Sequence, residues 1–237
     1  MDETILVLCG SSAFLGVLHT ILGPDHYLPF IVMSRARNWS YYKTGWITFL
    51  CGVGHVGSSV VLGMIGVLFG VALKDLLKIE DVRGGLAAWL LVFFGIAYMV
   101  WGIFRSRKNR PHRHYHLHNG GISHVHLHTH EKEHEHIHRS EKIVNLTPWV
   151  LFTIFALGPC EVLIPNLMYP ASENNYLGVL MVAVVFSVAT IATMIGVVLL
   201  LSFGIKNIRL GFLERYMHAL AGAAVFLSGC AIVFLDW

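Results

Sequence analysis

Long apolar stretches separated by short polar segments dominate the chain. The stretches lie at about residues 5–33, 44–73, 85–104, 147–169, 176–203 and 216–236. A helix that crosses a bilayer needs about 20 largely apolar residues, and these stretches lack the strict alternation of a membrane β-barrel. The pattern therefore predicts an all-α integral membrane protein with six transmembrane helices.

Two of the apolar stretches are interrupted by the same kind of motif. The chain reads Leu-Gly-Pro-Asp-His at 22–26 and Leu-Gly-Pro-Cys-Glu at 157–161. Proline removes a backbone donor, and glycine lowers the cost of leaving the helical conformation, so each motif should break its helix. The residues that we expect to break the helices are Gly23, Pro24, Gly158 and Pro159.

The interruptions divide the chain into two similar halves. We predict a first three-helix membrane repeat at 1–104, a loop at 105–146 and a second three-helix repeat at 147–237. Because three is an odd number, the second repeat has to enter the membrane in the opposite direction. In secondary transporters built from such inverted repeats, the binding site lies between the broken helices near the bilayer midplane.

Charge is scarce and unevenly placed. Only 13% of the residues are charged, against roughly a quarter in an average soluble domain, which argues against a water-soluble enzyme. The connections after the first, third and fifth stretches are rich in Lys and Arg, whereas the connection at 74–83 carries both signs. The cations of the three basic connections are Arg35, Arg37 and Lys43; Arg105, Arg107, Lys108, Arg110, Arg113, Lys132, Arg139 and Lys142; and Lys206, Arg209 and Arg215. The positive-inside rule then predicts a multi-pass protein of the inner (cytoplasmic) membrane, with both termini outside and the 105–146 loop in the cytoplasm.

Polar side chains near the two breaks are candidates for a metal or substrate site in the membrane. A carboxylate in a span costs about 2.5–3.5 kcal/mol on insertion scales, so it normally faces a pathway or a partner. Imidazole nitrogen and carboxylate oxygen suit divalent first-row metals, and a thiolate favours softer or tetrahedral ions. The candidate residues are His19, Asp25, His26, His55, Cys160 and Glu161. Two structural alternatives stay open, since Asp25 could cap the following half-helix and His55 could bond a neighbouring helix.

The loop between the halves is saturated with histidine. Eleven of the fifteen histidines alternate with other residues there, and neutral imidazoles in such tracts chelate metals. We expect this loop to lack regular structure and to buffer metal, with a merely solubilising linker as the alternative. The eleven are His112, His114, His116, His118, His124, His126, His128, His130, His134, His136 and His138.

The chain resembles the nickel/cobalt transporters of the LysE superfamily, close to the NicO and UreH-like membrane proteins. The resemblance rests on His19 followed by Asp25-His26, on the inverted six-span layout and on the histidine-rich loop. It implies transport of nickel or cobalt with the ion site around Asp25 and His26. The same superfamily holds the TauE/SafE anion exporters and the thiol-redox carriers similar to CcdA and DsbD. The Pro159-Cys160 pair looks like the Pro-Cys motif of those carriers, but they use a cysteine in each half, and Asp25 stands at the equivalent place here.

These observations favour a secondary transporter of divalent transition-metal ions, namely nickel, cobalt or zinc, and not an enzyme. The ion is the cargo, and no permanently bound cofactor is expected. The histidine loop favours export, because it collects ions on the side from which they leave, although an importer could use it to receive them. Export of sulfite or another small sulfur-containing anion and thiol-redox transfer are the alternatives. Beyond the ion and the lipid bilayer, the partners considered are a second copy of the chain and a cytoplasmic metallochaperone; no nucleic acid is expected.

Overall fold

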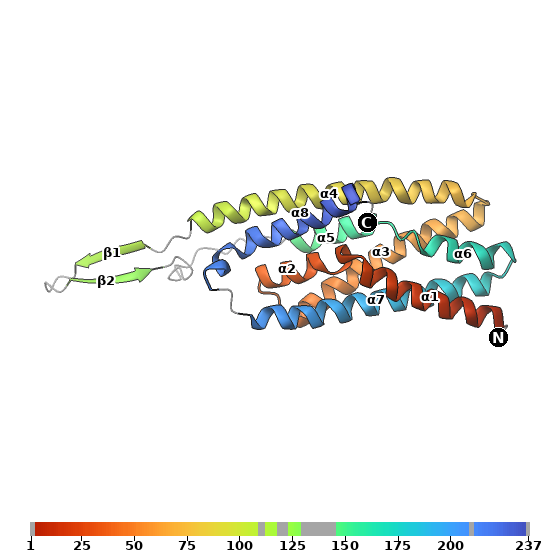
Figure 1. The fold of residues 1–237 in the computed structure, drawn as a ribbon, viewed down its shortest axis with the longest axis horizontal. Coiled ribbons are helices and arrows are strands. Elements are labelled where there is room, and N and C mark those ends of the chain that lie inside the picture. Colours follow the sequence, from red (N-terminus) through yellow and green to blue (C-terminus); the bar gives the residue numbers. More distant parts are fainter. Residues whose placement is uncertain (1–2, 109–111, 118–122, 129–145, 209–210, 236–237) are drawn as a thin grey trace, which may run out of the picture.

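The membrane part of the protein is an elongated bundle of helices (Figure 1). The computed structural model describes residues 3–108, 112–117, 123–128, 146–208 and 211–235. Its helices are α1 (Glu3–Leu22), α2 (Leu28–Ala36), α3 (Tyr41–Phe69), α4 (Leu73–Lys108), α5 (Thr147–Leu157), α6 (Leu163–Ser172), α7 (Tyr176–Asn207) and α8 (Met217–Leu235). Short 3-10 turns occupy Pro24–His26 and Gly211–Tyr216.

Within the described residues, five segments are long and apolar enough to cross a bilayer. They are Glu3–Leu22, Tyr41–Phe69, Leu73–Arg107, Tyr176–Asn207 and Gly211–Leu235. The remaining expected span, 147–169, is divided between α5 and α6, neither of which is long enough alone. The chain is thus a multi-pass, helical membrane protein.

Both Leu-Gly-Pro motifs end a helix. At the first break, the amide of Gly23 donates to the carbonyl of His19 and is the last to extend the hydrogen bonding of α1. Pro24 has no amide hydrogen to donate, and the chain turns into α2. At the second break, the amide of Gly158 donates to the carbonyls of Ile154 and Phe155, and α6 begins only at Leu163. The two breaks lie about midway along the long axis of the bundle, so residues next to them lie deep inside it (Figure 1).

Helices α4 and α8 run side by side and make the closest backbone contact in the described bundle (Figure 1). A Cβ atom at Gly95 would collide with the backbone of Phe226, and one at Gly222 would collide with the backbone of Met99. Small residues allow this approach, which is how helices associate in lipid without a hydrophobic driving force. Helix α1 packs on α7, and α5 packs on α3.

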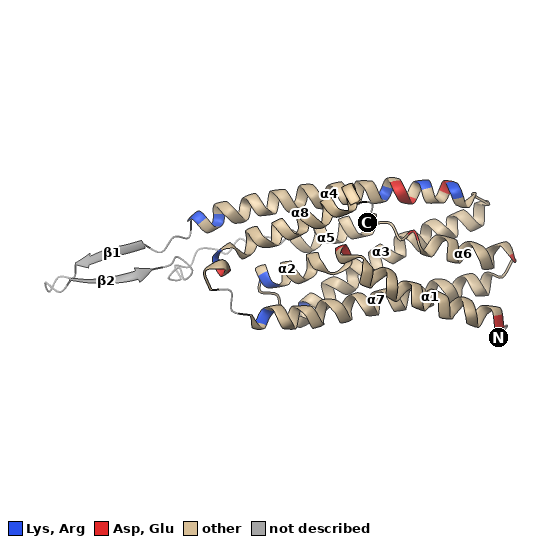
Figure 2. Cartoon of the chain, in the orientation of Figure 1, with Lys and Arg blue, Asp and Glu red and all other residues tan. Residues whose placement is uncertain are grey.

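Lys and Arg gather at one end of the bundle (Figure 2). That end holds the C-terminal ends of α2, α4 and α7, whereas the beginning of α4, at the other end, carries both signs. The structure extends α4 back to Leu73, so the 74–83 segment, expected as a polar connection, is helical.

The histidine-rich loop departs in part from the expected lack of regular structure. Strands β1 (His112–Leu117) and β2 (Ser123–His128) form an antiparallel pair that extends beyond the basic end of the bundle (Figure 1). Their register pairs His112 with His128 and His116 with His124. Strict alternation has the period of a strand, which accounts for the difference. The rest of the expected loop, at 109–111, 118–122 and 129–145, lies outside the described residues.

Candidate metal centre

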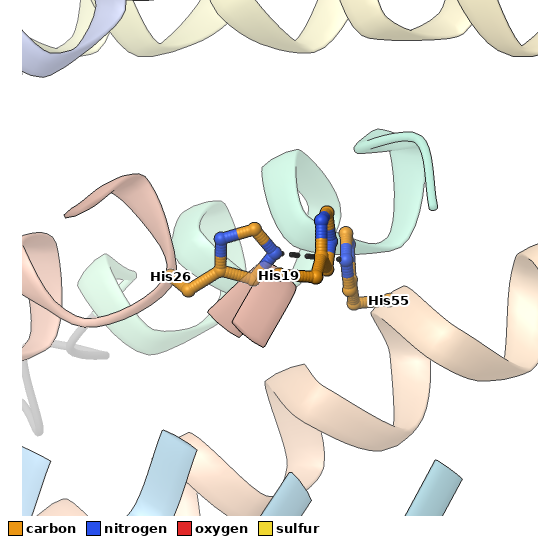
Figure 3. Close-up of side chains that lie close together, drawn as sticks. All are labelled: His19, His26 and His55. Carbon is orange, nitrogen blue, oxygen red and sulfur yellow. Dashed lines mark hydrogen bonds between the residues drawn. The ribbon is translucent and has the colours of Figure 1, made fainter. Parts of the chain in front are cut away.

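Three histidines from the first half meet in the middle of the bundle (Figure 3). His19 lies in the last turn of α1, His26 in the turn after the break, and His55 in α3. One nitrogen of each lies within 4.8 Å of the others. The rings of His19 and His55 are nearly parallel, at 6.3 Å, and His26 stands edge-on to both, at 4.6 and 4.9 Å. His26 and His55 are each only 3% exposed.

Hydrogen bonds between Nδ1 and a backbone carbonyl orient two of these imidazoles, those of His26 and His55. The Nδ1 of His55 lies 3.3 Å from the carbonyl oxygen of Phe155, and the Nδ1 of His26 lies 3.2 Å from that of Gly23. A carbonyl only accepts, so we assign the hydrogen to Nδ1 in both rings. The two Nε2 atoms then face each other at 3.2 Å (Figure 3).

Asp25 supports the cluster through His26. Its Oδ1 lies 3.2 Å from the Nδ1 of His26, on the side of the ring that faces away from His55. A carboxylate in this position fixes the ring and makes its other nitrogen a better ligand, as carboxylates commonly do behind metal-bound histidines. Asp25 is therefore placed to act through His26.

The break glycines leave the space that two of the rings occupy. A Cβ at Gly23 would lie 2.5 Å from the Nδ1 of His26, and a Cβ at Gly158 would lie 3.2 Å from the Nδ1 of His55. Glycine at these two positions thus serves the imidazoles as well as the ends of the helices.

The second break contributes a thiol. Cys160 is fully buried, and its Sγ lies 3.9 Å from the Nε2 of His19. Its backbone amide is held between the hydroxyl of Ser59, at 3.2 Å, and the carboxylate of Glu80, at 3.1 Å. All four cysteines of the chain are free, and Cys51 lies in a different core cluster from Cys160.

Glu161 does not join the histidines. Glu161 is exposed, and the charged groups that act on its carboxylate are the carboxylates of Asp81 and Glu80. Of the six membrane residues proposed from the sequence, the structure therefore gathers His19, His26 and His55, with Asp25 behind the cluster and Cys160 at its edge.

Sequence reasoning missed Glu80 and Arg83. Glu80 is fully buried, and Arg83 contacts it with an Nη1–Oε1 distance of 2.6 Å. The sequence pattern places both in the mixed-charge connection at 74–83. The available signal was their i, i+3 spacing, which places opposite charges side by side once the segment is helical.

The side chains of the loop histidines lie outside the part of the chain that the structure describes. Those of β1 and β2 are described by their backbone alone, and His118, His130, His134, His136 and His138 lie outside the described residues. Metal buffering by the loop stays a prediction.

Comparison with known proteins gives a family match. The family model described as the cytochrome c biogenesis protein transmembrane region matches residues 27–231. The match begins just after the first break, covers the second break and most of α8, and carries no indication of nickel or cobalt. No curated protein and no solved structure matches the chain.

Proposed function

The chain belongs to the family of cytochrome c biogenesis protein transmembrane regions, a membrane family of the CcdA and DsbD type, and we propose that this member carries a divalent transition-metal ion across the membrane. The ion would bind between the breaks, on His19, His26 and His55. Nickel, cobalt and zinc are the candidate cargoes, because imidazole is a good ligand for all three.

The observation that carries this proposal is the pair of facing Nε2 atoms. With both Nδ1 hydrogens directed at carbonyls, two neutral rings present lone pairs to each other at 3.2 Å, which is repulsive unless a cation lies between them. Metal–nitrogen bonds of about 2.05 Å at a tetrahedral angle separate two ligand nitrogens by about 3.3 Å. The observed spacing is thus the spacing of two ligands on one tetrahedral ion. A proton shared by the rings, with Asp25 as the counter-charge, would fill the same place, so the ion and the proton compete for it.

The donor set favours ions that accept tetrahedral geometry. Three imidazoles would occupy three positions, and the Cys160 thiolate is near enough to His19 to become a fourth ligand after a small movement. Three nitrogens and one sulfur suit zinc and cobalt, whereas nickel more often takes planar or octahedral nitrogen and oxygen sites. Zinc and cobalt are therefore expected to bind this site more tightly than nickel.

The two breaks also suggest how the chain is arranged in the membrane. We propose six spans in two inverted repeats, counting α1 with α2 and α5 with α6 as one broken span each. In support, Gly95 meets Phe226 and Gly229 meets Val92, two contacts that exchange when one half is shifted by 134 positions onto the other (229 − 95 = 226 − 92). The basic end seen in Figure 2 would face the cytoplasm.

Thiol-redox transfer is the second candidate, because the family match and the Pro159-Cys160 pair favour it. That activity, as the resemblance to CcdA-type carriers implies it, needs a second thiol that can pair with Cys160. The Cys160 sulfur lies 3.9 Å from the Nε2 of His19, and Cys51 packs in the other core cluster. The immediate surroundings of the thiol therefore suit a metal ligand better than half of a disulfide.

Flux into proteoliposomes tests the proposal. Purified protein should move Co²⁺, Ni²⁺ or Zn²⁺ faster than empty vesicles, and His26→Ala should abolish this flux. The matched control is His218→Ala, which removes an imidazole at the start of α8 that bonds Tyr98 and is not part of the three-histidine cluster, and it should leave flux intact. Metal flux that is absent from the native protein, or equal in His26→Ala, would contradict the proposal. Flux of reducing equivalents abolished by Cys160→Ser would favour the redox candidate instead.

A further inference from the structure

We propose that Glu80 and Arg83 of α4 are positioning residues that hold the second break in place and thereby set Cys160 beside the histidines. We call this ion pair the Glu80–Arg83 clamp. The positioning of the thiol stands on the geometry alone, whereas its consequence for metal binding rests on the function proposed above.

A broken helix in a membrane leaves backbone groups that need partners. The last carbonyls of α5 and the first amides of the chain leading to α6 have none within their own helices, and lipid offers none. Arg83 donates from Nη2 to the carbonyl of Ala156 at 3.1 Å, and Glu80 accepts the amide of Cys160 at 3.1 Å. A single ion pair therefore satisfies groups on both sides of the break.

The signs of the two charges match the helix ends that they meet. A helix C-terminus carries partial negative charge and a helix N-terminus partial positive charge. The cation of the clamp lies at the end of α5, and the anion lies where the chain turns into α6. Exchanging the two residues would place each charge against a like partial charge.

The clamp also reaches the metal-site helix α3. Arg83 donates to the Ser58 hydroxyl at 2.6 Å, and that hydroxyl donates to the carbonyl of His55 at 2.8 Å. The Cys160 amide is shared between Glu80 and Ser59, the next residue of α3. One connected set of hydrogen bonds thus joins the backbone of His55 to the backbone of Cys160.

Close packing brings α4 near enough for these bonds. A Cβ at Gly84 would lie 2.8 Å from the Cγ of Pro159, so a larger residue has to push α4 away from the break. Gly85, the next residue, has open space at the same position. The two glycines provide a test of the approach that leaves both charges in place.

A contribution to folding stability alone does not explain why an ion pair stands at this place. Burying two charges is costly, and well-packed apolar residues often replace a buried ion pair without loss of stability. Removing one partner, by contrast, strands the other charge in the interior. The informative variant is therefore the neutral pair Glu80→Gln with Arg83→Gln, which removes both charges together and so strands neither of them.

The experiment follows the thiol in the full chain with Cys9, Cys51 and Cys230 replaced by alanine, purified into nanodiscs. The rate of Cys160 alkylation by N-ethylmaleimide measures how firmly the break is held. The Co²⁺ absorption spectrum, recorded with residues 112–138 also deleted so that the loop histidines do not contribute, separates ligation by the membrane histidines, seen in the d–d bands, from ligation by the thiolate, seen in the charge-transfer band. The test variants are Glu80→Gln/Arg83→Gln and Gly84→Ala. The controls are Gly85→Ala and Asp75→Asn/Lys78→Gln, an exposed pair at the same i, i+3 spacing.

We expect both test variants to alkylate about tenfold faster, the factor that corresponds to one lost hydrogen bond to a charged group. They should also lose the thiolate band while keeping the d–d bands, and both controls should behave as the parent does. Alkylation of the neutral pair at the parent rate would overturn the clamp, and if that variant fails to fold, Gly84→Ala against Gly85→Ala decides. A parent protein without any Co²⁺ spectrum would contradict the proposed function, while the alkylation rates would still decide the clamp.

Discussion

Replacing Asp25 by asparagine should weaken metal binding about tenfold without unfolding the protein. Loss of a partner behind a metal-bound histidine generally costs 10- to 100-fold in affinity. Here the Nδ1 hydrogen of His26 has a second acceptor, the carbonyl of Gly23, at the same 3.2 Å as the carboxylate. The ring therefore keeps its tautomer in the variant and loses mainly the negative charge behind it. That places the effect at the lower end of the range, at about 1.4 kcal/mol.

Two further variants bracket this expectation. His26→Ala removes a ligand outright and should weaken binding more than Asp25→Asn does. Asp75→Asn removes an exposed carboxylate at the start of α4 and should change nothing. Affinity is measured by competition between the protein and a coloured chelator for Co²⁺, with residues 112–138 deleted so that the loop histidines do not contribute.

The order of the three affinities decides the matter. Binding by Asp25→Asn equal to that of the parent would show that the carboxylate does not support the ligand. Binding as weak as that of His26→Ala would show that Asp25 is itself a ligand, contrary to the geometry. Unfolding of Asp25→Asn, seen by circular dichroism, would contradict the assumption that Gly23 holds the ring.

Three other expectations concern the whole molecule. Deleting 112–138 should leave transport at saturating metal unchanged and alter only its dependence on metal concentration in proteoliposome flux; loss of all flux would mark the loop as an obligatory metal donor. Lowering the pH from about 7.5 to about 5.5 should weaken Co²⁺ binding in titrations, because protons compete for Nε2, and pH-independent binding would refute imidazole ligation. Gly222→Leu should lower thermal stability in detergent by about 1–3 kcal/mol, because its side chain meets the Met99 backbone, whereas Gly204→Leu on the open side of α7 should not.

Apolar length and the two Leu-Gly-Pro motifs were enough to predict most of the helical layout. The expected stretches correspond to α3, α4, α7 and α8, and the motifs end α1 at Leu22 and α5 at Leu157. These features are local, since they depend on the transfer of side chains into lipid and on the backbone chemistry of proline. The six-span count and the repeat stay predictions, because α5 and α6 are each too short to cross alone.

The site was less accessible to sequence reasoning. His19, Asp25 and His26 are close in sequence, so a break that turns the chain back brings them together, and His55 was found because histidine is rare in a span. Glu161 was expected opposite them because it follows the second break as His26 follows the first, yet it is exposed. Glu80 and Arg83 were overlooked because a balanced cluster of charges usually marks a loop. Only the tertiary contact of α4 with the second break shows that Glu80 is buried and Arg83 partly buried.

The glycine-lined contact of α4 with α8 limits how the protein can move. One helix belongs to each half of the chain, and their backbones touch without side chains between them. Separating the halves as two rigid bodies would open a gap that lipid tails fill poorly, so the α4–α8 contact is expected to stay closed when the protein moves. In the proposed transport, any opening toward either side of the bilayer would come from the short half-helices swinging about their glycine breaks, so the elements proposed to hold the ion would also release it.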